Sequence, residues 1–340
     1  MIAYYAHHHG SGHSHQAVAI AAHLTCPVIG LSSRPAPRGW AGPWVQLPND
    51  VGDVNPTTDD VTAGGVLHWA PRRHDGLLNR MRLISDALAR YRVRLLVADV
   101  SVEVSLLARL HGVPVVVMAQ PGDRTDPPHR AAYDLAERVL APWPARTPSG
   151  WPRTWRQKTD HVGAFCRFDG LRPHHHSPGR RVVVLWGTGG LDVRPAQIQE
   201  AAAATPEWAW DVVGPPVPGA GGPPNLRWRG WLDDVWSALS IADVVVTHAG
   251  QNAVAEVAAA RRPAVIVPQD RPHGEQRATG DMLVRCGIEV VELAWPRSQQ
   301  WPLLLEQASL RGGGAWGHWS FGDGAERAAA ILNQIAVGTR

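Results

Sequence analysis

Cysteine is scarce in this 340-residue chain: Cys26, Cys166 and Cys286 lie far apart and fit no Cys-x-x-Cys spacing. Such a scattered set is typical of reduced thiols, so it excludes a disulfide framework and predicts a cytoplasmic protein. No apolar run approaches the ~20 residues that span a bilayer. The N-terminus lacks a basic segment followed by an apolar one, so we expect no signal peptide. Any membrane contact would be peripheral, at the inner face.

An excess of charge of one sign is also missing, since 33 Lys and Arg residues face 30 Asp and Glu residues, a formal net charge of +3. This mildly basic balance permits an anionic ligand or an anionic membrane surface but does not indicate nucleic acid. No short-period repeat that would predict a solenoid is present. The length exceeds what one core usually holds, so we expect two domains.

Short apolar runs alternate with Ala-rich segments, which is typical of parallel sheets with crossover helices. In the first half this pattern predicts strands over 2–6, 93–100 and 113–120, and helices over 15–24, 102–112 and 131–141. Residues 142–180 are rich in Pro, Gly, Arg and His and are interpreted as loop and linker. Strands are then expected over 182–186, 209–214, 242–248 and 264–268, and a last helix over 324–336. The predicted fold class is α/β, with two doubly wound, Rossmann-like domains facing each other across a cleft.

Residues 247–256 read THAGQNAVAE and come directly after a predicted strand. In doubly wound sheets, ligands bind at the carboxyl ends of strands, where the next helix presents free N–H groups. Gly250 would let the backbone approach a ligand closely, and His248 and Asn252 could donate hydrogen bonds to phosphate oxygens. Glu256 could accept hydrogen bonds from ribose hydroxyls. The alternative is a capped strand–helix junction with a solvated Glu256.

Two neighbouring segments favour the ligand hypothesis. RGWLDDV (229–235) precedes a helix that leads into the strand, and QDRPHGEQ (269–276) follows the next strand. Glu275 and Gln276 would then lie at another strand's carboxyl end, where a carboxylate and an amide could bind the hydroxyls of a sugar.

These segments resemble the donor-binding region of GT-B glycosyltransferases. HAGQNAVAE matches the His-x-Gly-x-Asn…Glu signature of that group, except that Ala253 replaces the usual Ser or Thr. The change removes one phosphate hydrogen bond, worth about 1.5–3 kcal/mol when charge-assisted. GWLDDV and the Glu275–Gln276 pair are similar to the family 28 branch, which contains the N-acetylglucosaminyltransferase of peptidoglycan lipid II synthesis.

The resemblance implies a reaction and a domain plan. A hexosyl unit would pass from a nucleotide sugar, UDP-linked, to an acceptor hydroxyl with inversion. Residues 1–165 would bind the acceptor, 166–180 would be the linker, 181–322 would bind the donor, and 323–340 would form a helix packing back on the first domain. Leu232 would contact the base and Glu256 the ribose. The diphosphate would be held by His248, Gly250 and Asn252, and the turn with Gly187, Thr188 and Gly189 would face it. Gly12 and Gln251 would also belong to the nucleotide site.

A second glycine turn, AHHHGSGHSHQ (6–16), ends the first predicted strand. In GT-B enzymes a similar loop carries a His at the mouth of the cleft that acts as base toward the acceptor. An imidazole with its ordinary pKa near 6.5 suits this proton transfer, so His13 is the predicted general base. Asp99 is the first candidate to orient it and Glu103 the second. Asp99 as the N-cap of the following helix is the compatible alternative.

The His-rich runs raise the possibility of a metal site. His7–His9 would alternate between the two faces of a strand end and could not share one ion, and His174–His176 offer no zinc-like ligand spacing. The resemblance also implies that helix N-termini and side chains neutralise the leaving diphosphate. We therefore expect neither a metal nor another cofactor.

The acceptor is less well defined. Segment 71–94 forms either a basic amphipathic surface for anionic lipid or the solvated face of an ordinary helix; its arginines are Arg72, Arg73, Arg80, Arg82, Arg90, Arg92 and Arg94. The first interpretation favours a lipid-linked acceptor and the second a small hydroxylated molecule. Arg124 and His129, after another strand, are candidates for acceptor contact.

Two rival functions stay open. A nucleotide-sugar 2-epimerase shares the fold but usually lacks the His-x-Gly-x-Asn…Glu turn. A catalytically silent sugar-nucleotide-binding subunit that needs a partner is the other, and the presence of His13 argues against it.

Overall fold

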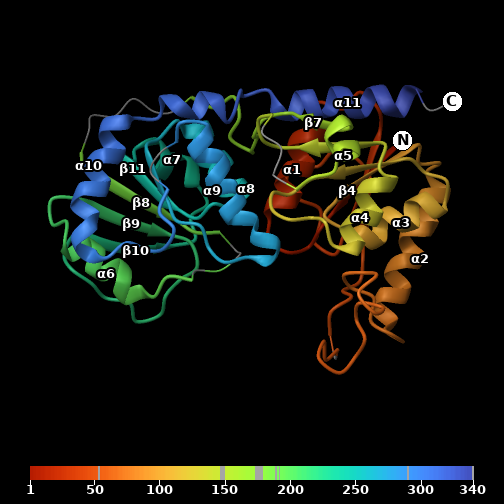
Figure 1. Ribbon diagram of the computed structural model, residues 1–340, viewed down its shortest axis with the longest axis horizontal. Coiled ribbons are helices and arrows are strands. Elements are labelled where there is room, and N and C mark those ends of the chain that lie inside the picture. The colour runs from red at the N-terminus through yellow and green to blue at the C-terminus, as the bar shows by residue number, and fades with distance from the viewer. Residues whose placement is uncertain are drawn as a thin grey trace. The chain divides into compact units, whose positions relative to one another are not determined.

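A computed structural model describes residues 1–52, 54–145, 150–172, 179–187, 190, 192–288 and 291–338. The chain divides into two compact units: unit 1 holds residues 1–162 and 324–340, and unit 2 holds residues 163–323. Each unit is a parallel sheet flanked by helices (Figure 1). The predicted α/β class with two doubly wound sheets is confirmed.

The unit 1 sheet has the strand order β3-β2-β1-β4-β5-β6-β7, and every neighbouring pair is parallel. Its central strands are buried along their whole length, as expected of a parallel sheet covered on both faces. The strands are β1 (Ile2–Ala6), β2 (Val28–Ser32), β3 (Trp44–Gln46), β4 (Leu95–Asp99), β5 (Val115–Met118), β6 (Arg138–Ala141) and β7 (Thr159–His161).

The helices of unit 1 include one from the far end of the chain. α11 (Gly324–Gly338) packs on α1 (Gly12–Ala21), and its Asn333 Oδ1 accepts hydrogen bonds from the N–H groups of Thr25 and Cys26 at 3.1 and 3.2 Å. The other helices are α2 (Asp75–Arg90), α3 (Val102–Leu110), α4 (Pro127–Leu135) and α5 (Arg153–Gln157). None of the helices, over the described residues, is long and apolar enough to cross a membrane.

The unit 2 sheet has the order β10-β9-β8-β11-β12 and is also parallel. Its strands are β8 (Arg181–Leu185), β9 (Ala209–Val213), β10 (Leu226–Gly230), β11 (Val244–Thr247) and β12 (Ala264–Ile266). Its helices are α6 (Pro195–Ala203), α7 (Val235–Ser240), α8 (Gln251–Ala260), α9 (Glu275–Arg285) and α10 (Trp301–Arg311), and short 3-10 turns cover 272–274, 298–300 and 314–318.

Tryptophan fills a large part of both cores, which accounts for much of the unusual total of 16. In unit 2 the buried indoles of Trp186, Trp208, Trp210 and Trp301 pack together with aliphatic side chains. In unit 1 the buried set is Trp143, Trp151 and Trp155. All three belong to residues 142–180, so interpreting that whole segment as loop and linker is wrong: α5 and β7 lie within it.

One predicted helix is also wrong. Residues 131–141 are the end of α4 and then a strand, β6, because Ala136 has extended backbone angles (φ −65°, ψ 138°) that end the helix. The helix instead begins earlier, at Pro127. Proline fits the first turn of a helix, where its missing N–H would have no partner.

The order of each sheet reverses at one place, between β1 and β4 in unit 1 and between β8 and β11 in unit 2. At these switch points Ala6 pairs with Asp99, and Leu185 pairs with Thr247. The loops that leave neighbouring strands diverge there and open a crevice, which is where doubly wound sheets bind ligands.

Candidate active site

The switch point of unit 1 brings the predicted base and its orienting carboxylate together. His13 lies in the first turn of α1, directly after β1, and Asp99 ends β4. His13 Nδ1 lies 2.9 Å from Asp99 Oδ1, with the His13 side chain 15% exposed and the Asp99 side chain 2% exposed. The Tyr4 hydroxyl, from the neighbouring strand, donates to Asp99 Oδ2 at 3.3 Å.

This geometry fixes the tautomer of His13. A carboxylate only accepts hydrogen bonds, so Nδ1 carries the proton and Nε2 keeps its lone pair. A neutral imidazole held in this way can accept a proton from a hydroxyl. The next residue, Val100, has φ +64°, a strained conformation for a β-branched side chain of the kind that gathers at functional sites.

The structure also places the alternatives to the His13–Asp99 pair, namely Asp99 as a helix N-cap and Glu103 as the orienting carboxylate. Ser101, rather than Asp99, is the N-cap of α3, because its side chain accepts from the N–H of Val104 at 3.2 Å. Glu103 accepts hydrogen bonds from the backbone N–H groups of His68 and Trp69 at 2.8 and 3.1 Å. It therefore holds a loop.

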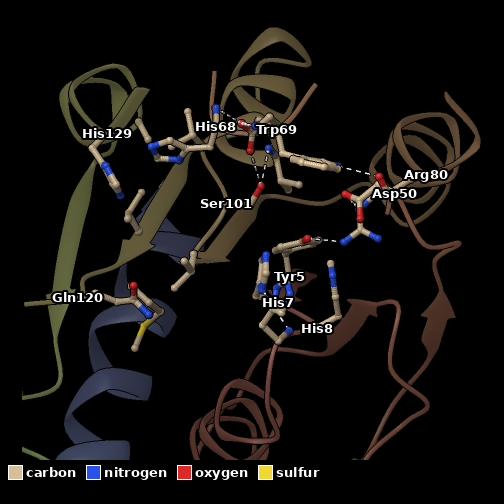
Figure 2. A pocket seen from close by; sticks show the side chains of 18 of the residues that line it. Tyr5, His7, His8, Asp50, His68, Trp69, Arg80, Ser101, Gln120 and His129 are labelled. Carbon is tan, nitrogen blue, oxygen red and sulfur yellow. Dashed lines mark hydrogen bonds and ion pairs between the residues drawn. The ribbon is translucent and has the colours of Figure 1, made fainter. Parts of the chain in front are cut away.

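Beside the dyad, unit 1 has a half-open cavity of about 450 Å³ (Figure 2). Residues from the end of β1, from α2, from the start of α3, from the end of β5 and from α4 line it. Apolar and aromatic side chains such as Trp69, Met81 and Tyr133 cover much of its wall. Sequence reasoning missed this cavity because its walls come from these five elements and also from the loops that hold Asp50 and Trp69.

The three N-terminal histidines lie together at this cavity, so the prediction that they alternate between two faces is wrong. β1 ends at Ala6, and the ring centroid of His7 lies 4.6 Å from that of His8 and 5.0 Å from that of His9. Burial and the neighbouring His13 lower the pKa of His7 to about 2. Its imidazole is therefore neutral at physiological pH.

Arg80 belongs to neither surface proposed for segment 71–94, because its side chain is 1% exposed and points into unit 1. The guanidinium donates to Tyr5 Oη at 2.5 Å and to the carbonyl of Pro48 at 2.9 Å, and it lies 3.5 Å from Asp50. It also donates to Ser33 Oγ. Figure 2 shows it on the wall of the cavity.

Two further imidazoles, those of His68 and His129, lie on the side of the view in Figure 2 away from Arg80. Asp126 bridges His68 Nε2 at 2.9 Å and His129 Nδ1 at 2.5 Å. Burial raises the pKa of Asp126, but the two hydrogen bonds outweigh it and lower the pKa to about 2. Burial lowers the pKa of His129 to about 4. These three side chains are potential zinc ligands, yet the Arg124 guanidinium, 3.4 Å from His129 Nε2, disfavours a cation.

In unit 2 the predicted nucleotide turn lies between β11 and α8. The N–H of Gly250 donates to His248 Nδ1 at 3.0 Å. A Cβ at Gly250 would lie 2.5 Å from His248 Cε1, so the glycine is needed for this close approach. Burial, then Arg271, lowers the pKa of His248 to about 4, so its imidazole is neutral at physiological pH.

Glu256 is buried, which excludes the solvated residue of the alternative interpretation. Its Oε1 accepts a hydrogen bond from Arg167 Nε at 2.9 Å. Burial raises the pKa of Glu256, and the Arg167 guanidinium opposes that rise. Arg167 was not predicted, since nothing in its local sequence marks it.

Gln276 is also buried and connects two loops of the site. Its Oε1 accepts from the N–H of Ala249 at 3.1 Å and from the N–H of Gln269 at 2.9 Å. Glu275 beside it begins α9 and is half-buried. The oxygen of Gln276 therefore shapes the turn, and the role of the pair toward a sugar stays a prediction.

The remaining predicted residues divide into three groups. Gln251 and Asn252 begin α8, and Gly12 begins α1 next to His13. Leu232 lines a different hollow of about 900 Å³ whose lining includes no residue of the 248–256 turn. Gly187 follows β8, whereas Thr188, Gly189 and His174–His176 lie outside the described residues.

Comparison with known proteins adds sequence relationships. Residues 220–291 match the C-terminal domain of glycosyltransferase family 28. The UDP-N-acetylglucosamine–N-acetylmuramyl-(pentapeptide) pyrophosphoryl-undecaprenol N-acetylglucosamine transferase of Pseudomonas paraeruginosa is 30% identical over 206 residues, 54% of each chain. The protein of that name from Leifsonia xyli is 37% identical over 95 residues, 26% of each chain. The chain thus spans about half the length of the first relative and a quarter of the second.

Solved structures define the fold. The glycosyltransferase of kitacinnamycin superimposes with a TM-score of 0.72 at 18% identity, covering 98% of both chains. MurG of Acinetobacter baumannii superimposes with a TM-score of 0.59 at 17% identity, covering 99% of this chain and 98% of its own. The predicted resemblance to GT-B glycosyltransferases and to the family 28 branch is therefore confirmed. We conclude that the chain has the GT-B fold and that its residues 220–291 are similar to the C-terminal domain of glycosyltransferase family 28.

Proposed function

We propose that this protein is a glycosyltransferase that moves a hexosyl unit from a nucleotide sugar to an acceptor hydroxyl by a single displacement with inversion. The observation that carries the proposal is the 2.9 Å contact between His13 and Asp99. His13 Nε2 would remove the proton of the acceptor hydroxyl as its oxygen attacks the anomeric carbon. Asp99 would stabilise the imidazolium that forms. The bond from that carbon to the nucleoside diphosphate breaks in the same step.

Unit 2 would bind the donor. Val254 N–H makes the first hydrogen bond of α8, to Gly250 O, so the preceding N–H groups of the helix have no intrahelical acceptor. Such a helix N-terminus suits a diphosphate, and it stabilises the leaving group as charge develops. We propose UDP as the nucleotide, because the relatives' names specify a UDP-sugar. Neither a metal ion nor another cofactor takes part in this scheme.

The acceptor would bind unit 1, where the dyad and the 450 Å³ cavity lie together. The curated relatives are named for a pyrophosphoryl-undecaprenol acceptor. A lipid-linked acceptor would require contact with the inner face of a membrane, whereas a small-molecule acceptor would not.

Nucleotide binding tests the donor half directly. Calorimetry with UDP, TDP, GDP, UDP-glucose and UDP-N-acetylglucosamine is expected to show one preferred nucleotide. Glu256→Gln should weaken that binding about 10–100-fold, the size of a lost charged hydrogen bond. Glu207→Gln, at an exposed position of the same unit, is the matched control. Equal affinity in both variants would refute the ribose role of Glu256, and absence of any nucleotide binding would refute the proposed function.

The products distinguish the rival activities. A transferase releases UDP only as a glycosylated product forms, and the rate should not change with EDTA. A 2-epimerase would convert UDP-N-acetylglucosamine into its C2 epimer without an acceptor, which NMR of the sugar ring detects. Binding of the nucleotide with neither reaction would indicate the silent subunit.

A further inference from the structure

The cavity of unit 1 has a volume in the range of pockets that hold one small organic molecule. Such pockets have about 300–1,000 Å³, are lined mainly by apolar and aromatic side chains, and carry a few well-placed polar groups. At about 450 Å³, this cavity lies in the lower part of that range. Trp69, Tyr5 and Tyr133 give it flat aromatic walls, which favour contact with another ring.

The two arginine side chains of the cavity already have protein partners. Arg80 donates to Tyr5 and Pro48 and lies against Asp50. Arg124 donates to the carbonyl of Pro121 at 2.9 Å and to Gln120 Oε1 at 3.3 Å. An anionic ligand would have to displace these contacts, so the electrostatics of the cavity favour an uncharged one.

The cavity also contains a polar group that a ligand could satisfy. Both ring nitrogens of His8 are buried and have no hydrogen-bond partner among the described residues. Buried polar atoms are nearly always paired, so two unpaired nitrogens on a residue that lines the cavity indicate a missing partner. Figure 2 shows His8 on the cavity wall, on the same side of the view as Arg80. Burial lowers the pKa of His8, which favours the neutral ring.

The dyad lies next to this space. His7 lines the cavity, and its ring centroid lies 6.0 Å from that of His13 in an edge-on arrangement. A ligand inside the cavity could therefore present a hydroxyl toward the base while its body stays between the aromatic walls.

We propose that the cavity binds the acceptor and that this acceptor is a compact, uncharged, largely aromatic molecule with a hydroxyl group, held by a hydrogen bond to His8. This inference rests on the proposed glycosyl transfer and specifies its second substrate. A lipid-linked muramyl diphosphate does not fit this acceptor class. It is much larger than the cavity and carries charges that the cavity does not complement.

The test compares three probes on the full chain by calorimetry: 2-naphthol, 2-naphthyl phosphate and farnesol. They represent a compact neutral aromatic, its anionic counterpart and a flexible prenyl chain. We expect 2-naphthol to bind at least 10-fold more tightly than the other two. His8→Phe should weaken it at least 10-fold, because the ring remains and the nitrogens are lost. His23→Phe, at an exposed position just after α1, should leave binding unchanged.

Two results would overturn the inference: tighter binding of the phosphate or of farnesol, or unchanged 2-naphthol affinity in His8→Phe. If that variant does not fold, as judged by circular dichroism, Ala132→Leu replaces it. Ala132 lines the cavity from α4, and the larger side chain should reduce 2-naphthol binding by filling the space. Retained affinity in Ala132→Leu would refute the site.

The nucleotide panel keeps the two proposals apart. Binding of UDP without binding of 2-naphthol would remove the acceptor class and leave glycosyl transfer in place. Binding of 2-naphthol without any nucleotide would refute glycosyl transfer, and the cavity would remain a site for compact neutral aromatics.

Discussion

The two units have the same kind of sheet, but their polar side chains have different roles. Both have a parallel sheet with one switch point, at β1/β4 and at β8/β11. In unit 1, polar groups such as His8 and His13 lie at a cavity or a dyad. In unit 2, Gln276 and His248 accept hydrogen bonds from backbone N–H groups of the turn, and Glu256 is paired with Arg167.

The difference indicates how each unit would recognise its ligand. In unit 2, side chains hold the turn in shape by hydrogen bonds to its backbone. The free N–H groups at the N-terminus of the following helix can then bind any diphosphate. A cavity lined by side chains selects by shape and by hydrogen bonding. Unit 2 would thus bind the diphosphate that all nucleotide donors share, and unit 1 would select the acceptor.

The largest effect is expected for His13→Ala. Loss of a general base lowers kcat by about 10²–10⁴-fold, while the affinity for UDP, measured by calorimetry, should stay unchanged because unit 2 is intact. His23→Ala, close to the C-terminal end of α1, is the control for histidine loss. Turnover equal to wild type would remove the base assignment, and loss of UDP binding would contradict the division between the units.

Gly250→Ala is the reciprocal change in unit 2. The new Cβ would lie 2.5 Å from His248 Cε1, so the ring must move and its hydrogen bond from the Gly250 N–H is lost. We expect a destabilisation of about 1–3 kcal/mol, seen in urea unfolding, together with weaker UDP binding. Gly317→Ala, where the added Cβ meets nothing within 4 Å, should change neither quantity. Unaltered UDP affinity in Gly250→Ala would mean that the turn does not hold the diphosphate.

Acid should weaken unit 1 more than unit 2. The pKa values of His7 and His129 are lowered to about 2 and about 4, against about 6.5 in the unfolded chain. At pH values between 6.5 and the pKa in the folded state, the unfolded state binds more protons than the folded state. The contribution of these imidazoles to the free energy of unfolding is therefore present above pH 6.5 and lost below it. The loss by pH 5.5 should be on the order of 1 kcal/mol per imidazole.

In unit 2 the lowered pKa of His248 has the same effect, but two carboxyl groups change the stability in the opposite direction. Burial raises the pKa of Glu256 and of Asp169, so their contribution to stability is present at low pH and lost as the pH rises through the folded values. Hydrogen–deuterium exchange of peptides from β4 and β8, corrected for intrinsic rates at pH 7.5 and 5.5, measures the two units separately. Equal loss of protection in both would contradict the predicted asymmetry.

The sequence was sufficient for features carried by local pattern. Apolar runs located β1, β4 and β5, and the spacing of HAGQNAVAE pointed to the turn before α8. The proximity of His13 and Asp99 also follows from pattern, because β1 and β4 flank a switch point. The catalytic role of this pair stays a prediction.

Features built from distant segments were not predictable in this way. Arg80 resembles six other arginines of segment 71–94, and only the packing of α2 against Tyr5 distinguishes it. The contact between Arg167 and Glu256 joins residues 89 positions apart. The strand β6 was taken for helix because its four residues continue an Ala-rich helical pattern. Tertiary contacts decide such cases, and a single sequence does not contain them.

The smallest effect is expected for Tyr4→Phe, which removes the hydroxyl that donates to Asp99 Oδ2 at 3.3 Å and leaves the His13 contact in place. One hydrogen bond of this kind contributes about 1 kcal/mol to holding Asp99 in place against His13, so the looser positioning of the carboxylate should lower kcat, by about 5-fold at most, with KM unchanged. A carboxylate that loses a donor holds an imidazolium more strongly. The acidic limb of the kcat/KM profile should therefore move to higher pH.

That shift in the pH profile separates a positioning role from a merely structural one. A cavity left by the missing oxygen would lower the free energy of unfolding, yet it would not change where the base titrates. Tyr91→Phe, at the C-terminal end of α2, serves as the control and should leave the profile unchanged. If Tyr4→Phe lowers kcat without moving the profile, Tyr4 only fills space beneath the dyad. If the profile moves, the hydrogen-bond network of unit 1 extends from His13 through Asp99 into the buried centre of its sheet.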